Sequence, residues 1–329
     1  MGIPQDTLIR LVRYMIGSLA THSQRDIVLF IKNIVCWHQG KLIEYNALGK
    51  AKQDKLRDAV ASGNIQAIKE AHQSLDDYLF KGLDEIFLYC FEQASEYFQD
   101  YRKTAHTPRF CVKMFGRIPG KIEQHIITMM HTSKTLDSCT SSSVERDHNT
   151  AFIDTANTGK TYLCNDIPSA AQNGEYVNPR LIPERVNSYR KPWFPRVNSF
   201  RGKKDDAWRQ CWKGYSEGSP VPEDCYKSTL VIPLTLVGHA VKRTISDEFW
   251  IFFRDNLDDG KTIDELRRTI VGYFCMDTPE LNFFNHQMDE DIGWLIADIL
   301  SLYWFSGCCY TSFSNIYKNA EKLLKPNPE

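Results

Sequence analysis

The stretch from Thr269 to Trp304 constrains the fold most, because two different periodicities meet in it. Residues 269–277 form an almost wholly apolar run that ends in an acid, the pattern of a central strand covered on both faces. Thr278-Pro279-Glu280 breaks the run, since proline fixes its own φ and moves the preceding residue away from the helical region. From Asp289 onward, apolar residues recur at helical spacing behind three acids, which the dipole favours at a helix start. The stretch therefore predicts a buried strand, a turn and a long helix.

Apolar stripes in the first hundred residues predict further helices. One stripe runs from Leu8 to Leu19, and a second begins at Ile27 and continues until Ser62-Gly63-Asn64 stops the helix. A third stripe runs without proline from Ile65 to about Arg102, in steps of three, four or seven. A helix of that length spans about 55 Å, so we expect part of its stripe to face the C-terminal helix or a second copy of the chain. A three-helix bundle within one chain, with no signalling role, is the alternative.

After Thr107-Pro108 the composition turns toward strands. Residues 109–115 and 125–130 predict a hairpin, and 161–164 and 228–234 predict further strands. Residues 141–145, three serines followed by valine and an acid, predict a helix cap, with a helix that ends near Thr158-Gly159.

The C-terminal pattern resembles the closing segment of GAF domains, which are small-ligand sensor modules. The likeness rests on the strand 269–277, the turn 277–284 and the helix that contains Ile296-Ala297-Asp298. The strand 228–234 is similar to the family's penultimate strand, proline included, and the likeness covers Arg109 to Tyr310. The resemblance implies an α+β fold: an antiparallel sheet flanked by helices, here preceded by an N-terminal helical region. About thirty residues follow Leu236 where the family has a tight turn, and 249–253 predict an extra strand within them.

Two domains follow from these patterns. We expect a helical region over 1–104, which serves as a bundle for dimerisation or as signalling helices. We expect a GAF-like ligand-binding domain over 105–325, with a basic aromatic insertion at 180–213 and a C-terminal helix at 287–325.

The insertion suggests the ligand. It holds ten basic residues against three acidic ones, with Tyr, Trp and Phe between the charges. Arginine matches phosphate oxygens and aromatic faces stack on bases, so the segment is suited to an anionic ligand that contains a base. The alternative is a solvated insertion whose aromatic residues hold it to the sheet. The expected ligand-binding residues are basic, aromatic or polar and lie in or before this segment: Asn165, Asp166, Tyr176, Arg180, Arg185, Tyr189, Arg190, Lys191, Trp193 and Trp208.

Motifs for catalysis are missing from the sequence. It has no glycine-rich phosphate loop, no Gly-x-Ser-x-Gly elbow and no His-Glu-x-x-His pair. Its ten cysteines lack the spacing of a zinc site or a disulfide scaffold. We therefore expect no catalytic residue, no cofactor and no metal. The predicted function is a non-enzymatic, cytoplasmic sensor that binds a small anionic ligand, with nucleotides and cyclic nucleotides as candidates, and relays occupancy through its helices.

The expected partners follow from the same features. They are the ligand, a second copy of the chain through the helices, and a separate downstream effector. A formal net charge of -1 gives no reason to expect a membrane or a long nucleic acid.

Two other functions stay open. Residues 165–171 resemble the Asp-Ile-Pro stretch of phytochrome-type GAF domains, which hold a bilin through a cysteine. Cys225 lies too close to the strand at Ser228 for that attachment, and Cys211 lies too far from it. The other alternative is a structural or interaction module whose pocket is filled by its own side chains.

Overall fold

The computed structural model describes residues 22–117, 124–132, 143–145, 149–178, 226–237, 268–285 and 287–324. These residues belong to two compact units. The helical unit contains α2 (His22–Ala61), α3 (Ile65–Glu96), the π-helix η1 (Tyr97–Tyr101) and α11 (Met288–Leu324) from Leu295 onward. The sheet unit contains the described residues from His106 to Thr235 and from Arg268 to Trp294. The predicted domain boundary assigns the whole C-terminal helix to the sheet domain, whereas the structure divides this helix between the units.

Helices α2 and α3 form a hairpin. Gly63 takes a positive φ of 67° after α2 ends. The side chain of Asn64 then caps α3 by accepting hydrogen bonds from the backbone of Gln66 and Ala67. Ser62-Gly63-Asn64 therefore ends one helix and starts the next, as predicted.

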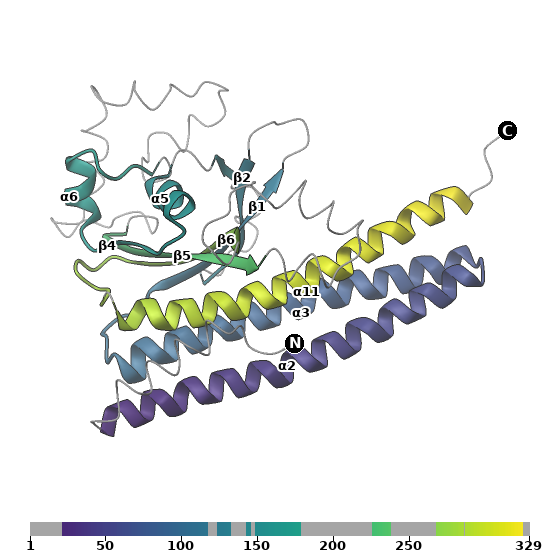
Figure 1. Cartoon of the computed structure of the whole chain (residues 1–329), viewed down its shortest axis with the longest axis horizontal. Coiled ribbons are helices and arrows are strands. Elements are labelled where there is room, and N and C mark those ends of the chain that lie inside the picture. Colours follow the sequence, from purple (N-terminus) through teal and green to yellow (C-terminus); the bar gives the residue numbers. More distant parts are fainter. Residues whose placement is uncertain are drawn as a thin grey trace. The chain divides into compact units, whose positions relative to one another are not determined.

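The helical unit is a three-helix bundle within the chain. The predicted stripe of α3 is buried: Leu75 is 0% and Cys90 is 1% exposed. Figure 1 shows α2, α3 and α11 side by side. Gly307 of α11 lies against Leu83 of α3 and Tyr45 of α2, so the three helices share one core. The C-terminal helix is thus the predicted partner of the α3 stripe.

The sheet unit is built on six described strands in the order β3-β2-β1-β6-β5-β4. They are β1 (Arg109–Arg117), β2 (Gln124–His131), β3 (Ser143–Glu145), β4 (Tyr162–Cys164), β5 (Ser228–Val237) and β6 (Arg268–Thr278). β1 and β2 form the predicted antiparallel hairpin. β6 lies between β1 and β5, and its residues 270–276 are buried, so the prediction of a central strand is confirmed. The class is α+β, as expected.

The two faces of the sheet carry different side chains. On one face, Phe110, Val112 and Met114 of β1 are almost fully buried. Gly293, in the first turns of α11, lies against Ile232 and Met276. Short helices α5 (Thr150–Thr158) and α6 (Ile167–Gln172) pack on the opposite face.

The prediction for residues 141–145 was wrong in part. Ser143–Glu145 is strand β3, which pairs with β2, and α5 begins only at Thr150. Asn149 provides the cap, because its side chain accepts hydrogen bonds from the backbone of Ala151 and Phe152. The predicted end of this helix is confirmed, since Thr158 is its last residue and Gly159 takes the left-handed conformation.

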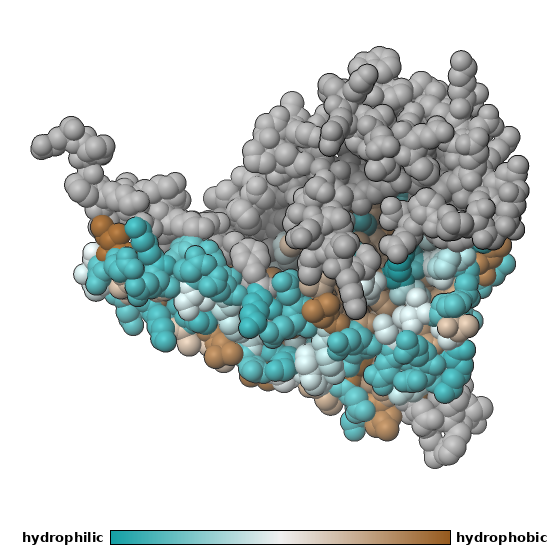
Figure 2. Space-filling view, turned by 180° about the vertical axis from the view of Figure 1, so that it is seen from behind, coloured by the Kyte–Doolittle hydropathy of each residue, from teal (hydrophilic) through white to brown (hydrophobic). Residues whose placement is uncertain are grey.

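Several predictions lie outside the described residues. They are the stripe from Leu8 to Leu19, the whole insertion at 180–213, the extra strand at 249–253 and the cysteines Cys211 and Cys225. Figure 2 shows hydrophobic patches set among the hydrophilic residues of the described surface. Among the described helices, none has an apolar stretch of the length that crosses a membrane.

Candidate functional site

Polar side chains gather on one face of the central strands. Arg109, Cys111 and Lys113 alternate along β1 with residues that are buried on the other face. The antiparallel register places Arg109 opposite Asp277, Cys111 opposite Cys275, and Lys113 opposite Tyr273. Partners in an antiparallel pair point to the same face. We call the row formed by Arg109, Cys111, Lys113, Thr229, Tyr273, Cys275 and Asp277 the polar face; Thr229, Tyr273 and Cys275 in it are at most 3% exposed, and the last two belong to the core beneath α5 and α6.

Asp277 is the acidic centre of the polar face. Thr229 Oγ1 on β5 donates a hydrogen bond to its Oδ1 at 2.6 Å. Burial raises the pKa of Asp277, while the Arg109 charge and the Thr229 hydrogen bond act in the opposite direction. Cys164 of β4 is the register partner of Thr229 on β5. Side chains of the four neighbouring strands β4, β5, β6 and β1 therefore form one row across the sheet.

A buried hydroxyl cluster adjoins Asp277. The hydroxyls of Tyr176 and Tyr226 lie 2.8 Å apart, and Asn178 Nδ2 donates to the Tyr226 oxygen at 2.7 Å. All three side chains are buried. Burial raises the pKa of Tyr226, and the charge of Asp277 raises it further. Both tyrosines are therefore neutral hydrogen-bonding groups at ordinary pH.

Lys113 supplies a cation at the other end of the polar face. Its Nζ donates to Thr128 Oγ1 at 2.9 Å and lies 6.0 Å from the centroid of the Phe152 ring. Among the described residues, no carboxylate lies within 4.0 Å of this ammonium. Lys113 is a half-buried cation whose described contacts are a hydroxyl and an aromatic face and whose charge also lowers the pKa of Asp277, and such a cation can accept an anion.

Three predicted ligand-binding residues fall within the described structure, and each has a local partner. Asn165 donates from Nδ2 to the Phe284 carbonyl at 2.8 Å and accepts from the Phe284 N–H at 3.0 Å. Asp166 caps α6 by accepting from the backbone of Ser169 at 3.0 Å. Tyr176 follows α6, and its hydroxyl bonds to that of Tyr226.

The structure thus brings Tyr176 to the polar face, while Asn165 and Asp166 hold the exit of β4. The other predicted residues lie outside the described ranges: Arg180, Arg185, Tyr189, Arg190, Lys191, Trp193 and Trp208.

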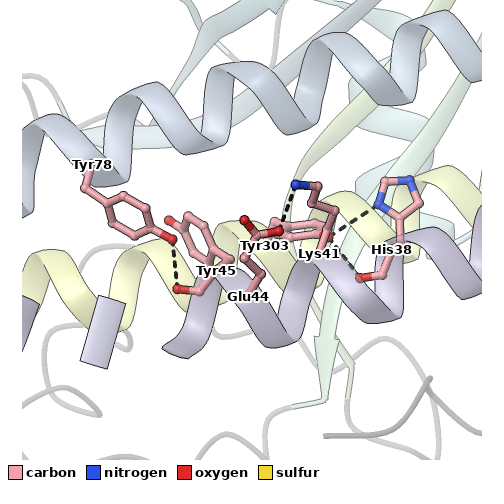
Figure 3. Close-up of polar contacts among 6 residues, drawn as sticks. All are labelled: His38, Lys41, Glu44, Tyr45, Tyr78 and Tyr303. Atoms are coloured by element: carbon pink, nitrogen blue, oxygen red, sulfur yellow. Dashed lines mark hydrogen bonds and ion pairs between the residues drawn. The ribbon is translucent and has the colours of Figure 1, made fainter. Parts of the chain in front are cut away.

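The helical unit contains a second buried polar cluster (Figure 3). Tyr303 of α11 donates its hydroxyl to the His38 carbonyl at 3.0 Å and lies 3.4 Å from His38 Nδ1. Cys90 Sγ of α3 lies 3.9 Å from His38 Nε2, so one imidazole contacts both other helices. Burial lowers the pKa of His38 from 6.5 to about 4, although a hydrogen bond with Gln93 acts in the opposite direction. His38 is therefore neutral at physiological pH.

Within the described residues, no group of three or more His, Cys, Asp or Glu side chains is arranged to hold a metal ion. Comparison with protein-family models, with curated proteins and with solved structures returned no match. The GAF resemblance therefore stays a prediction, and the assignment of function depends on the geometry of the two polar clusters.

Sequence reasoning missed Lys113, Asp277, Thr229 and Tyr226 as site residues. A signal was present in β1, where polar side chains at 109, 111 and 113 interrupt an otherwise apolar strand at a spacing of two. Such a pattern puts these side chains on one face of a strand. The pairing register, which sets them against Asp277 and Cys275, depends on contacts far apart in sequence.

Proposed function

We propose that the protein is a non-enzymatic sensor of the GAF type that binds a small anionic ligand on the polar face. The observation that carries this proposal is Lys113, a half-buried cation with no carboxylate within 4.0 Å among the described residues. Ligand sites are largely apolar with a few convergent polar groups. On the polar face, Lys113 lies beside the aromatic rings of Phe152 and Tyr273, and the Arg109–Asp277 pair lies four residues farther along the same two strands.

The proposal uses α11 as the route from ligand to output. This helix supplies residues to both units, up to Trp294 in one and from Leu295 in the other. In the sheet unit, Trp294 donates its indole N–H to Thr161 Oγ1 at 2.9 Å. In the helical unit, Tyr303 is bonded to His38. Ligand binding shifts the helix packing only if the two packings have different affinities for the ligand.

We include a second copy of the chain among the partners. The outer side of α2 exposes Leu29, Cys36 and Ile43 at intervals of seven residues, and Leu29 and Ile43 are 56% and 72% exposed. A seven-residue repeat of this kind suits a helix that pairs with a copy of itself. Ile43→Glu would then convert a dimer to a monomer in light scattering, while Lys55→Glu, an exposed change on the same helix that lies off this seven-residue repeat, would leave it dimeric.

The effector that receives the signal is a separate protein in this proposal. The ten cysteines, which lack disulfide-scaffold spacing, support a cytoplasmic location.

A thermal-shift screen tests the ligand. The probes are nucleoside mono-, di- and triphosphates, cyclic nucleotides and small dicarboxylates. A ligand at about 100 times its Kd adds about 2.7 kcal/mol to the free energy of unfolding, which corresponds to about 5 to 10 °C in Tm for a domain of this size. We expect such a shift for one class of anion, its loss in Lys113→Met and its retention in Lys113→Arg.

Lys41→Met is the matched control, because Lys41 lies on α2, where its described partners are Glu44, in a surface ion pair, and the ring of Trp37. It should preserve the full ligand-induced shift. If no anion raises the Tm of the wild-type chain, or if Lys113→Met responds as the wild type does, the sensor proposal is wrong.

One observation favours an interaction module without a ligand. Tyr176, Tyr226 and Asn178 satisfy one another and fill part of the polar face with the protein's own side chains. This alternative predicts a flat thermal-shift screen together with a dimer that persists in every condition. The same two measurements therefore separate the functions.

A further inference from the structure

Two thiols face each other across the centre of the sheet. Cys111 on β1 and Cys275 on β6 are register partners in an antiparallel pair, and neither belongs to a disulfide among the described residues. Such partners have Cα atoms about 4.5 or 5.5 Å apart and side chains on one face. A disulfide requires a Cα separation of about 4.4 to 6.8 Å. The backbone therefore already has the spacing that a bond between these sulfurs needs.

The two thiols differ in accessibility. Cys111 is half-buried, whereas Cys275 is 3% exposed. Both lie in the same apolar cluster beneath α5 and α6. Burial raises the pKa of Cys275, while Lys113 acts in the opposite direction. A reagent in solution therefore reaches Cys111 first, and Cys275 is placed to attack the Cys111 sulfur once that sulfur is in a mixed disulfide.

Among the other described cysteines, Cys164 is excluded as a partner by its position in the sheet. Cys164 lies on the same side of the sheet, but β5 separates its strand from β6. At about 4.8 Å per strand the two backbones are about 10 Å apart, beyond the reach of a disulfide. Cys36 and Cys90 lie on α2 and α3 of the helical unit.

We propose that Cys111 and Cys275 form a reversible disulfide by exchange with a small-molecule disulfide, and that this bond regulates binding on the polar face. The Cys111 thiolate attacks one sulfur of the reagent, whose S–S bond breaks to release one reduced thiol. Cys275 then loses its proton and attacks the Cys111 sulfur, which releases the second reduced thiol. Two protein thiols are oxidised and one reagent disulfide is reduced to two thiols.

The regulatory step rests on the proposed function. The cysteine pair lies between Arg109–Asp277 and Lys113–Tyr273 in the same two strands. A bond there draws the Cys111 side chain against β6 and fixes the separation of the Lys113 cation from the Asp277 carboxylate. An anion held by Lys113 would therefore meet a different surface in the oxidised protein, and we expect its Kd to change at least about threefold, which is about 0.6 kcal/mol.

The test treats the reduced full-length chain with oxidised glutathione and maps cysteine connectivity by peptide mass spectrometry. We expect a peptide that joins Cys111 to Cys275 and disappears on reduction. Cys275→Ala should instead accumulate glutathione on Cys111, because the second thiol is missing. Cys164→Ser is the matched control and should still form the bond.

A wild-type chain that yields no Cys111–Cys275 peptide, or that yields it only in urea, overturns the proposal. Ligand titrations of the oxidised and reduced protein test the second half. If the disulfide forms and the Kd of a bound anion is unchanged, the regulatory claim fails. If the disulfide forms and no anion binds in either state, the proposed sensor function fails while the thiol chemistry stands. If an anion binds and no disulfide forms, the thiol chemistry fails while the sensor function stands.

Discussion

Protonation of His38 should destabilise the helical unit in mild acid. The folded pKa is about 4, against 6.5 for an unperturbed histidine. The unfolded chain takes up the proton at a higher pH than the folded chain does. The contribution of His38 to the free energy of unfolding is therefore full above pH 6.5 and falls as the pH drops toward 4. Between about pH 8 and about pH 5, this difference lowers the free energy of unfolding by about 2 kcal/mol. The groups that face the imidazole are uncharged in this range and cannot compensate: Tyr89, Cys90, Gln93 and Tyr303.

The assay is urea unfolding, followed by circular dichroism at 222 nm, at a series of pH values in that range. His38→Gln keeps a hydrogen-bonding side chain that does not titrate, so its stability should fall with acid by about 2 kcal/mol less than that of the wild type. The control is Leu48→Gln, which places the same side chain at a position of α2 that is 46% exposed, without removing a titratable group. It should retain the wild-type slope. Parallel curves for the wild type and His38→Gln would refute the reasoning, because His38 would then have the same pKa in both states.

Three further substitutions test the sheet unit and its site. Gly272→Ala should lower the free energy of unfolding in urea by about 3 kcal/mol, because the added methyl group meets a β1 carbonyl. Gly40→Ala should raise the same quantity by about 0.8 kcal/mol, because Gly40 on α2 has open space around it. Asn165→Ala should cost about 2 kcal/mol, because Phe284 loses both of its bonds to that side chain. Asp277→Asn should gain stability relative to the wild type as the pH rises above 3.8, because the raised pKa of Asp277 makes ionisation costly only in the folded chain. Urea titrations of both proteins at acid and neutral pH measure this difference in the free energy of unfolding. A difference that does not change with pH would show that Asp277 is freely solvated.

Much of the fold could be predicted because apolar patterns that extend over many residues indicate which side chains are buried. The stripe of α3 and the apolar run of β6 each contain many residues with one periodicity, so one exception does not obscure them. The error at 143–145 has the opposite cause. A three-residue strand is too short to show a period, and its pairing with β2 is a long-range contact. Serines before an acid are also typical of helix caps, whereas the actual cap is Asn149.

The candidate site was harder to predict because it depends on register. A one-residue shift between β1 and β6 would move Lys113 away from Tyr273 and Cys111 away from Cys275. Local sequence contains no information about that alignment. It did contain Asn165 and Asp166, but short polar residues after a strand serve as caps and loop anchors as readily as ligands, and here Asp166 caps α6 while Asn165 anchors the distant Phe284 loop.

The proposed relay makes His38 a reporter of ligand binding. Gly293 and Tyr303 are ten residues apart on α11, or about 15 Å along one helix axis. Gly293 lies so close to Ile232 and Met276 that the helix cannot slide there without repacking those side chains. Under the proposed relay, an anion that favours a different packing of α11 alters the Tyr303–His38 bond. We expect the ligand to shift the NMR resonances of the His38 ring, and Gly293→Ala to produce a shift without ligand. A ligand that raises the Tm but leaves the His38 resonances in place would show that binding does not reach the helical unit through α11.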